Sequence, residues 1–280
     1  MIRCFIAYYL LVIILKIHII GEDNRSDYLR KLYNGNVTSI QKADIIICPI
    51  PFTRDNIKIN NSNMSIEELT NIENIETKII YTGAINNFAK EKLKEKNIKV
   101  IDIMDEESFA IKNAIATSEG AIKKVIEMTP FTLNKSNVLI LGYGRIGKIL
   151  SHYLSSFGAK LYVEARSKKD IALIKSMGYN EVELEKIEEY LPIADVVINT
   201  IPSVIIDKNR VELLNSNSVF LDLASSPGGV DFEALKQRNI KSCWYLSIPS
   251  KDSPLSAAKY IKETIDEINR GNEKWEKKSM

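Results

Sequence analysis

The sequence has few cysteines and almost no net charge, and each scarcity excludes a class of protein. Its 280 residues contain three cysteines, Cys4, Cys48 and Cys243, which are odd in number and widely spaced. That pattern fits a reducing cytosol better than a disulfide framework. The 38 basic and 36 acidic residues leave a formal charge of only +2 and no basic stripe, so we predict no nucleic-acid partner. We also predict no metal site.

Histidine is scarcer still, because the whole chain contains only His18 and His152. His18 falls in the first expected strand, and His152 falls on the helix that follows a glycine-rich turn. A hydroxyacid dehydrogenase of the histidine–carboxylate kind needs a histidine that accepts the alcohol proton. Neither histidine suits that role, and we expect both to be structural.

The sequence also lacks an apolar run long enough to span a membrane. Residues 4–15 form an uninterrupted apolar run behind Arg3, like the front half of a signal peptide. No small-residue cleavage site follows, and Lys16 and His18 end the run before it reaches spanning length. We expect residues 1–15 to be an N-terminal extension, either an appended strand or a wrongly assigned translation start. The protein is expected in the cytoplasm, with membrane association as the less favoured alternative.

Short β-branched runs alternate with helix-like segments over the rest of the chain, which is typical of parallel βαβ units. A continuous helical pattern from residue 105 to residue 128 separates two series of expected strands. We predict two domains, over residues 16–110 and 111–245, and then a loop and a last helix over residues 246–280. The expected strands are residues 16–20, 44–48, 78–82 and 99–101 in the first domain, and 138–141, 160–163, 195–199 and 218–221 in the second.

The sharpest local motif is a glycine-rich turn, Gly142-Tyr143-Gly144-Arg145-Ile146-Gly147, between an expected strand and an expected helix. This is the context that a dinucleotide-binding fingerprint requires. The first glycine would make the tight turn, the second would admit the pyrophosphate, and the third would let the helix pack closely on its strand. A P-loop is excluded because Ile149 stands where Ser or Thr must bind magnesium.

Two later strands end in polar turns. Asn199-Thr200-Ile201-Pro202 follows one, and Asp222-Leu223-Ala224-Ser225 follows the other, before Pro227-Gly228-Gly229. Ligands of open α/β sheets bind beyond the carboxyl ends of the strands, so we predict that both turns face the nicotinamide. For any single residue here, an ordinary strand-ending turn is the alternative.

In this order, the motifs resemble those of the dipicolinate synthase A-subunit family. The resemblance covers residues 16–268 and is strongest from residue 113 to residue 231. Besides the glycine turn it rests on Asn113–Ala121, Ala165-Arg166-Ser167, Asn199–Ser203 and Asp222–Gly229. The chain departs from the family at Ser247 and Ser250, where glycines are expected, and at Ala116, where proline is common.

The resemblance implies two Rossmann-like α/β domains with parallel sheets, joined by crossing helices as in D-2-hydroxyacid dehydrogenases. The first domain would be the substrate domain, and the last helix would return to it. The implied reaction oxidises dihydrodipicolinate, or its hydroxytetrahydro precursor, to dipicolinate in the mother cell of a sporulating bacterium, and the hydride passes to NADP. The implied partner is the flavoprotein-like B subunit of dipicolinate synthase, and substrate would bind in the cleft between the domains.

The resemblance also bears on the choice of cofactor. An NAD enzyme places a carboxylate at the end of the second strand for the ribose hydroxyls, whereas an NADP enzyme uses basic and hydroxyl groups for the 2′-phosphate. The resemblance puts Ala165 at the position of the acid, with Arg166, Ser167 and Lys168 directly after it, which favours NADP. A shift of one residue would make Glu164 the NAD-type acid, so NAD stays open.

For the chemistry, Glu119 is the predicted proton acceptor or substrate-orienting group, because it is a carboxylate at an expected polar helix start. Helix capping by Thr117 or Ser118 together with Glu119 is an equal alternative. A dicarboxylate substrate needs hydrogen-bond donors, which Thr117, Ser118, Ser225 and the backbone around Gly228-Gly229 would supply.

Two other functions stay open. An NADP oxidoreductase of the shikimate dehydrogenase type has similar strand ends, but its lysine–aspartate pair is not identifiable in the first domain. A non-catalytic regulatory protein that senses dinucleotides is also compatible with the fold, since fold does not fix function.

Overall fold

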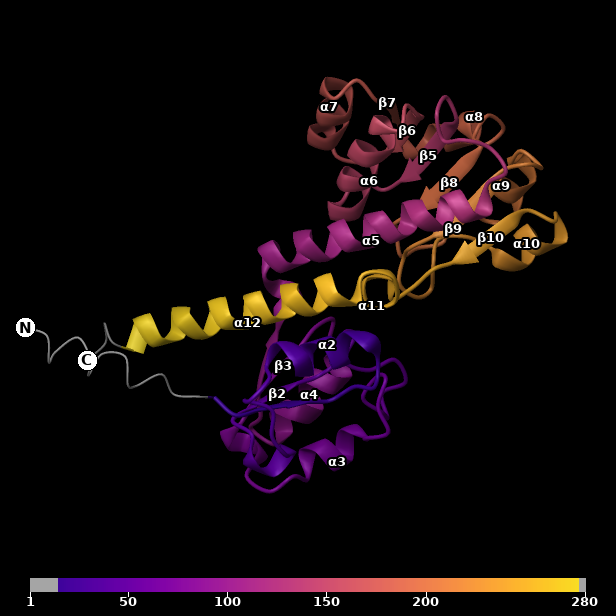
Figure 1. Ribbon diagram of the computed structural model, residues 1–280. Coiled ribbons are helices and arrows are strands. Elements are labelled where there is room, and N and C mark those ends of the chain that lie inside the picture. Colours follow the sequence, from indigo (N-terminus) through magenta and orange to yellow (C-terminus); the bar gives the residue numbers. More distant parts are fainter. Residues whose placement is uncertain (1–14, 277–280) are drawn as a thin grey trace, which may run out of the picture. The chain divides into compact units, whose positions relative to one another are not determined.

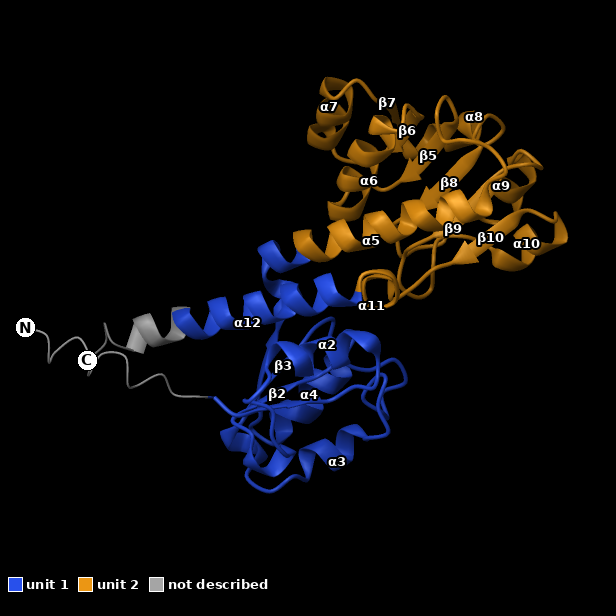
Figure 2. Cartoon of the chain, in the orientation of Figure 1, with its two compact units in different colours: residues 1–110, 254–280 blue, residues 111–253 orange. Residues whose placement is uncertain are grey.

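The computed structural model describes residues 15–276, with side chains as far as Arg270. The chain forms two compact units (Figures 1 and 2). Unit 1 combines residues 1–110 with residues 254–280, and unit 2 contains residues 111–253. Each unit is a parallel-sheet α/β domain, so the predicted fold class is confirmed. The predicted N-terminal extension, apart from Leu15, lies outside the described residues.

Unit 1 contains a four-stranded parallel sheet of order β1-β2-β3-β4. Its strands are β1 (Ile17–Ile19), β2 (Ile45–Ile47), β3 (Ile79–Thr82) and β4 (Lys99–Asp102), as the sequence predicted. Its helices are α2 (Asn24–Leu32), α3 (Ile66–Thr70), α4 (Asn87–Glu95) and α12 (Pro254–Glu276), with 3-10 turns η1 (Ile40–Lys42), η2 (Ile75–Thr77) and η3 (Ile103–Asp105).

The sheet of unit 1 is buried on both faces, because each face packs against its own core. Successive side chains of a strand point to opposite faces, so they alternate between the two cores. On β2, Ile45 and Ile47 pack in one core with residues of α2 and α12. Ile46 packs in the other core, with residues of α3 and α4. This double burial explains why the strands are uninterrupted isoleucine-rich runs rather than alternating apolar and polar residues.

Unit 2 contains a six-stranded parallel sheet of order β7-β6-β5-β8-β9-β10, which in chain order is the 3-2-1-4-5-6 arrangement of a Rossmann domain. The strands are β5 (Asn137–Leu141), β6 (Lys160–Glu164), β7 (Asn180–Val182), β8 (Val196–Asn199), β9 (Val219–Asp222) and β10 (Lys241–Trp244). The helices are α5 (Glu107–Met128, which begins in unit 1), α6 (Arg145–Ser156), α7 (Lys168–Ser176), α8 (Ile187–Tyr190), α9 (Lys208–Leu213), α10 (Phe232–Gln237) and α11 (Ile248–Asp252), with 3-10 turn η4 (Leu184–Lys186).

The strand order of unit 2 fixes where a ligand can bind. The connections leaving β5 and β8 run in opposite directions along the sheet, so these two neighbouring strands form the topological switch point. The carboxyl ends of β5, β6, β8 and β9 lie at one edge, since all four strands are parallel and their last residues are in register. The glycine turn follows β5 at this edge.

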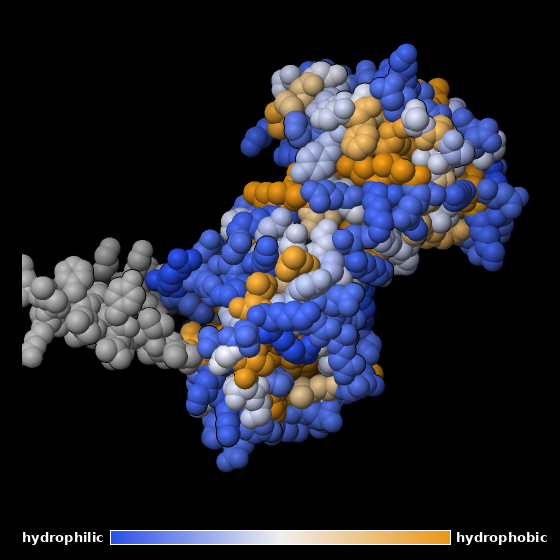
Figure 3. All heavy atoms as spheres, in the orientation of Figure 1, coloured by the Kyte–Doolittle hydropathy of each residue, from blue (hydrophilic) through white to orange (hydrophobic). Residues whose placement is uncertain are grey.

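The surface carries both hydrophobic and hydrophilic side chains. In the face that Figure 3 shows, hydrophobic areas are separate patches among hydrophilic side chains. Single exposed apolar residues such as Ile57 and Phe88 are ordinary on a folded protein. Within residues 15–276, none of the helices has the length and hydropathy that crossing a membrane requires.

Candidate dinucleotide-binding site

The first glycine of the turn is required by its neighbours. Gly142 has φ +95°, a conformation that L side chains rarely adopt. A Cβ atom here would lie 2.4 Å from Oγ1 of Thr200. That hydroxyl donates to the carbonyl of Leu141 at 2.8 Å, so Thr200 ties the turn to the neighbouring strand β8. Thr200 therefore fixes the backbone after β5 in two ways: it leaves no room for a side chain at position 142, and it donates to the carbonyl of Leu141.

The other two glycines differ in what surrounds them. A Cβ at Gly147 would lie 2.0 Å from the carbonyl oxygen of Gly142, so α6 can approach the turn only with glycine there. A Cβ at Gly144 would meet no atom within 4 Å. Gly144 is thus the one glycine of the turn whose missing side chain leaves open space, at the N-terminus of α6. This opening suits a pyrophosphate, which binds against backbone N–H groups at a helix N-terminus.

The remaining residues of the turn contribute differently. Tyr143 is 7% exposed and packs in the core beneath α6, and burial raises the pKa of its hydroxyl. Its side chain is thus part of the core, and its predicted contact with the cofactor stays a prediction. Arg145 is exposed and Ile146 is half-buried in the first turn of α6. Their predicted contact with the cofactor stays a prediction.

The end of β6 opens into a cavity of about 660 Å³. Ala165, Arg166 and Lys168 line it together with apolar side chains of α7, and Glu183 and Glu185 line another part of its wall. Ser167 is engaged elsewhere, because its hydroxyl accepts from the N–H of Asp170 at 3.0 Å and donates to that carboxylate at 2.7 Å. The basic side chains predicted for a 2′-phosphate therefore lie at this cavity, while the predicted serine caps α7.

Glu164 occupies the last position of β6, beside the turn. It is paired with Leu141 of β5 and is 1% exposed. Its Oε2 accepts from the N–H of Gly142 at 3.1 Å. Burial raises the pKa of Glu164, and the Gly142 hydrogen bond and nearby Arg166 partly offset that rise. The sequence makes this residue the alternative acid, and the structure brings it into direct contact with the glycine turn.

The polar turns after β8 and β9 are held together by two buried side chains. Asn199 and Asp222 are 0% exposed and are paired in the sheet register. Asn199 Nδ2 donates to Asp222 Oδ1 at 2.8 Å. Asp222 also accepts from the N–H of Ala224 at 2.9 Å and from that of Gly229 at 2.7 Å. These two side chains position the loops after β8 and β9, and the predicted contact of Asn199 and Asp222 with the cofactor stays a prediction.

Other predicted residues of these turns stay nearer the surface. Ile201 is half-buried, and Pro202 and Ser225 are exposed, whereas Leu223 and Ala224 are buried. Gly229 is required by the packing, because a Cβ there would lie 2.0 Å from Nδ2 of Asn199. The proline–glycine–glycine segment thus closes over the buried pair, and Ser225 is the predicted substrate-binding residue of this turn that solvent reaches.

The segment with Thr117, Ser118 and Glu119 is not at a helix start, and that part of the prediction is wrong. Helix α5 begins at Glu107 and runs through all three residues. The hydroxyl of Thr117 donates to the carbonyl of Asn113 at 2.8 Å within the helix, so it caps nothing. Ser118 is 0% exposed, and its Oγ has no hydrogen-bond partner among the described residues. Glu119 is exposed, and its predicted role in proton transfer stays a prediction.

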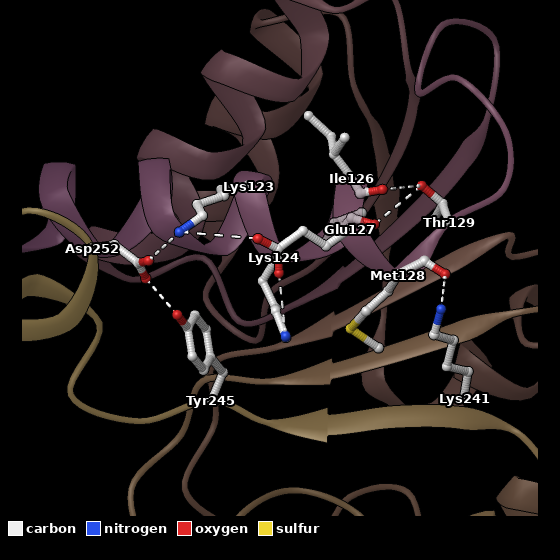
Figure 4. A network of polar contacts seen from close by, with 10 residues as sticks. Lys123, Lys124, Ile126, Glu127, Met128, Thr129, Lys241, Tyr245 and Asp252 are labelled. Atoms are coloured by element: carbon white, nitrogen blue, oxygen red, sulfur yellow. Dashed lines mark hydrogen bonds and ion pairs between the residues drawn. The ribbon is translucent and has the colours of Figure 1, made fainter.

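The glycine of that segment has a packing role instead. A Cβ at Gly120 would lie 2.2 Å from Cγ2 of Ile248 on α11. In Figure 4, Asp252 at the end of α11 lies between Lys123 of α5 and Tyr245. The carboxylate accepts from Lys123 Nζ at 2.8 Å and from the Tyr245 hydroxyl at 2.6 Å. Gly120 therefore lets α11 lie directly on α5.

Unit 1 contains a buried charge that the sequence did not indicate. Arg25, in the first turn of α2, is 4% exposed. Its Nη2 donates to the carbonyl of Ile50 at 3.0 Å, and Asp23 lies 3.6 Å away. Burial lowers the pKa of Arg25, and Asp23 opposes that shift. One arginine at a helix start carries no sequence signal for such burial.

Both units match known domain families. Residues 15–104 match the family described as the N-terminal domain of the dipicolinate synthase A subunit. Residues 110–238 match the NAD-binding domain of D-isomer specific 2-hydroxyacid dehydrogenases. Unit 2 is therefore a nicotinamide-dinucleotide-binding domain, and the glycine turn described above lies inside the matched region.

Matches to whole proteins extend over both units. The dipicolinate synthase A subunit of Bacillus subtilis (strain 168) is 26% identical over 258 residues, which are 90% of this chain and 87% of that protein. The crystal structure of the dipicolinate synthase A subunit from Bacillus halodurans has a TM-score of 0.81 at 28% identity, covering 91% of this chain and 97% of the other. The apo structure of D-lactate dehydrogenase from Escherichia coli, at 14% identity and a TM-score of 0.62 over 92% of this chain and 97% of that one, shares the fold alone. The chain is an NAD(P)-dependent oxidoreductase by these matches.

Proposed function

From the similarity to the dipicolinate synthase A subunit through both units, we propose that the chain is the A subunit of a dipicolinate synthase. It oxidises dihydrodipicolinate, or its hydroxytetrahydro precursor, to dipicolinate, and its cofactor is NADP. The observation that carries this proposal is the joint match of unit 1 and unit 2, since the similarity covers 87% of the Bacillus subtilis protein. A likeness confined to unit 2 would support only a dinucleotide-binding domain.

The chemistry agrees with the residues that the chain offers. Dihydrodipicolinate becomes aromatic when it loses one hydride and one proton, so the reaction needs no strong catalytic base. NADP, when bound, accepts the hydride. The hydroxytetrahydro precursor would in addition lose water. Neither His18 nor His152 is needed, and they lie on β1 and α6, respectively.

The chain's own residues hold the dinucleotide in the following way. The N-terminus of α6 and the open space at Gly144 receive the pyrophosphate. Thr200 and the pair Asn199–Asp222 keep the backbone turns in place around it. The exposed hydroxyl of Ser225 is the candidate donor to a substrate carboxylate at this turn, because the N–H groups of Gly228 and Gly229 already donate to the Ser225 carbonyl and to Asp222.

NADP is proposed over NAD because of the groups at the cavity beyond β6. Arg166 and Lys168 line it, and Ala165 offers no carboxylate to a ribose hydroxyl. A charge-assisted hydrogen bond contributes about 1.5–3 kcal/mol, which is roughly a tenfold to hundredfold gain in affinity for the 2′-phosphate.

The flavoprotein-like B subunit of dipicolinate synthase is the proposed partner, and the mother cell of a sporulating bacterium is the proposed compartment. The resemblance of the sequence to the family supports both. If the B subunit completes the active site, turnover of a fixed amount of the chain should rise as the partner is titrated in. A constant rate across the titration would contradict this role of the partner.

The proposed function is tested by hydride transfer with freshly made dihydrodipicolinate-pathway product. We would compare NADP with NAD, with and without the B subunit, and follow reduced cofactor and dipicolinate together. Equal amounts of NADPH and dipicolinate are the expected result. Cofactor binding without hydride transfer in every mixture would contradict the proposal and favour a regulatory protein that senses dinucleotides.

A further inference from the structure

Arg25 in unit 1 is a buried cation whose donors are mostly unused by the protein. Its Nη2 donates to the carbonyl of Ile50 at 3.0 Å, and this is the one hydrogen bond that the side chain makes with residues 15–270. The side chain is only 5% exposed. A guanidinium group carries several N–H donors and no acceptor, and a buried charge is costly unless it is paired and hydrogen-bonded. The chain alone therefore leaves Arg25 incompletely satisfied.

Asp23 offsets only part of this charge, because other donors occupy its carboxylate. Nη2 of Arg25 lies 3.6 Å from Oδ2 of Asp23, which is longer than a hydrogen bond. Oδ1 of Asp23 accepts from the N–H and the hydroxyl of Ser26, and Oδ2 accepts from Nδ2 of Asn61 at 3.0 Å. Burial lowers the pKa of Arg25, and Asp23 opposes that shift. A second anion beside Arg25 would stabilise the cation further.

The unused nitrogen atoms of Arg25 are not sealed inside the protein. Among the described residues, the side-chain atoms that are both fully enclosed and without a hydrogen-bond partner belong to Tyr33, Ser118, Glu164 and Thr264. Nε and Nη1 of Arg25 have no hydrogen-bond partner in the described chain and are not among those atoms. Solvent therefore reaches both nitrogens, and a small anion can approach the guanidinium group through them.

Arg25 also lies at the edge of its sheet where ligands bind. Strand β1 ends at Ile19, and Arg25 follows in the first turn of α2. Its acceptor Ile50 belongs to the loop after β2, the parallel neighbour of β1. The guanidinium group is thus beyond the carboxyl ends of two adjacent strands, which is the ligand-binding edge of an open α/β sheet.

A second arginine of α2 shows how the protein satisfies such a group when it serves structure. Arg30 Nη1 donates to the carboxylate of Asp27 at 2.7 Å, and Nη2 donates to the carbonyls of Ile19 and Gly21. The side chain of Arg30 is 36% exposed. One helix therefore supplies an arginine that the protein itself satisfies, Arg30, and one that it does not, Arg25.

We propose that Arg25 binds a carboxylate group of the substrate. Arginine pairs with a carboxylate through two parallel hydrogen bonds, and both dihydrodipicolinate and dipicolinate are dicarboxylates. Unit 1 matches a domain family of the dipicolinate synthase A subunit, whereas unit 2 matches a domain of 2-hydroxyacid dehydrogenases. A group that recognises this particular substrate is therefore expected in unit 1. The inference rests on the proposed function, from which it takes the substrate.

The test is the dissociation constant of dipicolinate, measured by titration calorimetry on the full-length chain in the presence of NADPH. Arg25→Gln removes the charge but keeps an amide that can donate to the carbonyl of Ile50. Its dissociation constant for dipicolinate should rise by about tenfold to a hundredfold, the effect of losing charge-assisted hydrogen bonds. Because the glycine turn lies in unit 2, the dissociation constant of NADPH should stay within about twofold of the wild-type value.

Arg30→Gln is the matched control, because it removes the same charge from the same helix. It should bind dipicolinate within about twofold of the wild type but should melt at a lower temperature, since three acceptors lose their donor. Arg25→Gln should show the reverse pattern. It should melt close to the wild-type temperature, because a poorly paired buried charge is removed and Asp23 keeps its other donors.

Arg25→Lys is a second variant that keeps the positive charge. A lysine cannot form the paired hydrogen bonds of a guanidinium group, so its affinity for dipicolinate should lie between those of Arg25→Gln and the wild type. If Arg25→Gln does not fold, Arg25→Lys with the wild-type affinity would overturn the inference.

Two further results would overturn it. One is an Arg25→Gln protein that melts at the wild-type temperature and binds dipicolinate as tightly as the wild type. The other is a wild-type chain that binds NADPH but not dipicolinate. Hydride transfer is not measured in these titrations, so the proposed reaction can fail while binding of dipicolinate still depends on Arg25. Conversely, turnover by a chain whose dipicolinate affinity does not depend on Arg25 would support the reaction and refute the inference.

Discussion

Gly144→Ala should separate cofactor binding from folding. A Cβ at Gly144 meets no atom within 4 Å, and the residue has φ −75°, which alanine adopts without strain. Alanine restricts the unfolded chain, which stabilises the folded protein by about 0.4–1 kcal/mol. It is also a poorer N-cap than glycine, which destabilises the helix by a similar amount. We therefore expect the free energy of unfolding, without cofactor, to change by less than about 0.5 kcal/mol.

The same substitution should weaken dinucleotide binding, because the added methyl group occupies the space left for the pyrophosphate. Overpacking by one carbon atom costs about 1–3 kcal/mol, so the dissociation constant should rise by roughly fivefold to 150-fold. The two measurements are denaturant unfolding of the apo protein and titration with NADP. Unchanged affinity with unchanged stability would refute the placement of the pyrophosphate over Gly144.

Gly147→Ala is the matched control and should show the opposite pattern. Its Cβ would lie 2.0 Å from the carbonyl oxygen of Gly142, a backbone atom that cannot rotate away. We expect a loss of about 1–3 kcal/mol in stability, which lowers the melting temperature by roughly 2–4 °C per kcal/mol for a unit of this size. Wild-type stability of this variant would mean that α6 can shift from the turn at no cost.

Three further substitutions test the rest of unit 2. Arg166→Ala should weaken NADP binding by about tenfold to a hundredfold and NAD binding by less than about twofold; equal losses for both would refute a 2′-phosphate contact. Asp222→Asn should lower the free energy of unfolding, measured with denaturant, by about 2–3 kcal/mol. The new amide nitrogen would face either the N–H of Gly229, now 2.7 Å from Asp222, or the Nδ2 of Asn199. Wild-type stability would contradict the positioning role of Asp222. Burial alone would raise the pKa of Asp252, but its contacts with Lys123 and Tyr245 outweigh burial, and the net pKa is lowered. The stabilisation is therefore present above the unfolded-state carboxyl pKa of about 3.9 and is lost as pH falls toward the lower folded value, and Asp252→Asn should abolish that part of the acid destabilisation.

The fold could be predicted from the sequence because both sheets are buried on two faces. Runs such as Ile45-Ile46-Ile47 and Val138–Leu141 are apolar at every position, which identifies parallel strands without knowledge of their partners. The glycine turn could also be identified from the sequence. Two of its glycines are required by close contacts, Gly147 with Gly142 and Gly142 with Thr200 after β8.

Two patterns in the sequence disagreed about the start of α5. The continuous helical pattern from residue 105 agrees with the observed start at Glu107, whereas Thr117 and Ser118, which are typical of helix caps, predicted a helix start in what is the interior of α5. In the structure the hydroxyl of Thr117 is satisfied by a carbonyl four residues earlier, so a helix can pass through such a segment. Gly120 on this stretch is buried against Ile248 of α11, and sequence periodicity does not report that contact.

Polar residues at strand ends raise the same difficulty in a sharper form. Asn199 and Asp222 lie 23 positions apart, and they meet only because β8 and β9 are neighbours in the sheet. The sequence shows two polar turns but not that their first side chains satisfy each other. Once that pair is buried, it keeps the ends of β8 and β9 in shape. The groups at this edge that stay open are the backbone at Gly144 and the cations Arg166 and Lys168 after β6.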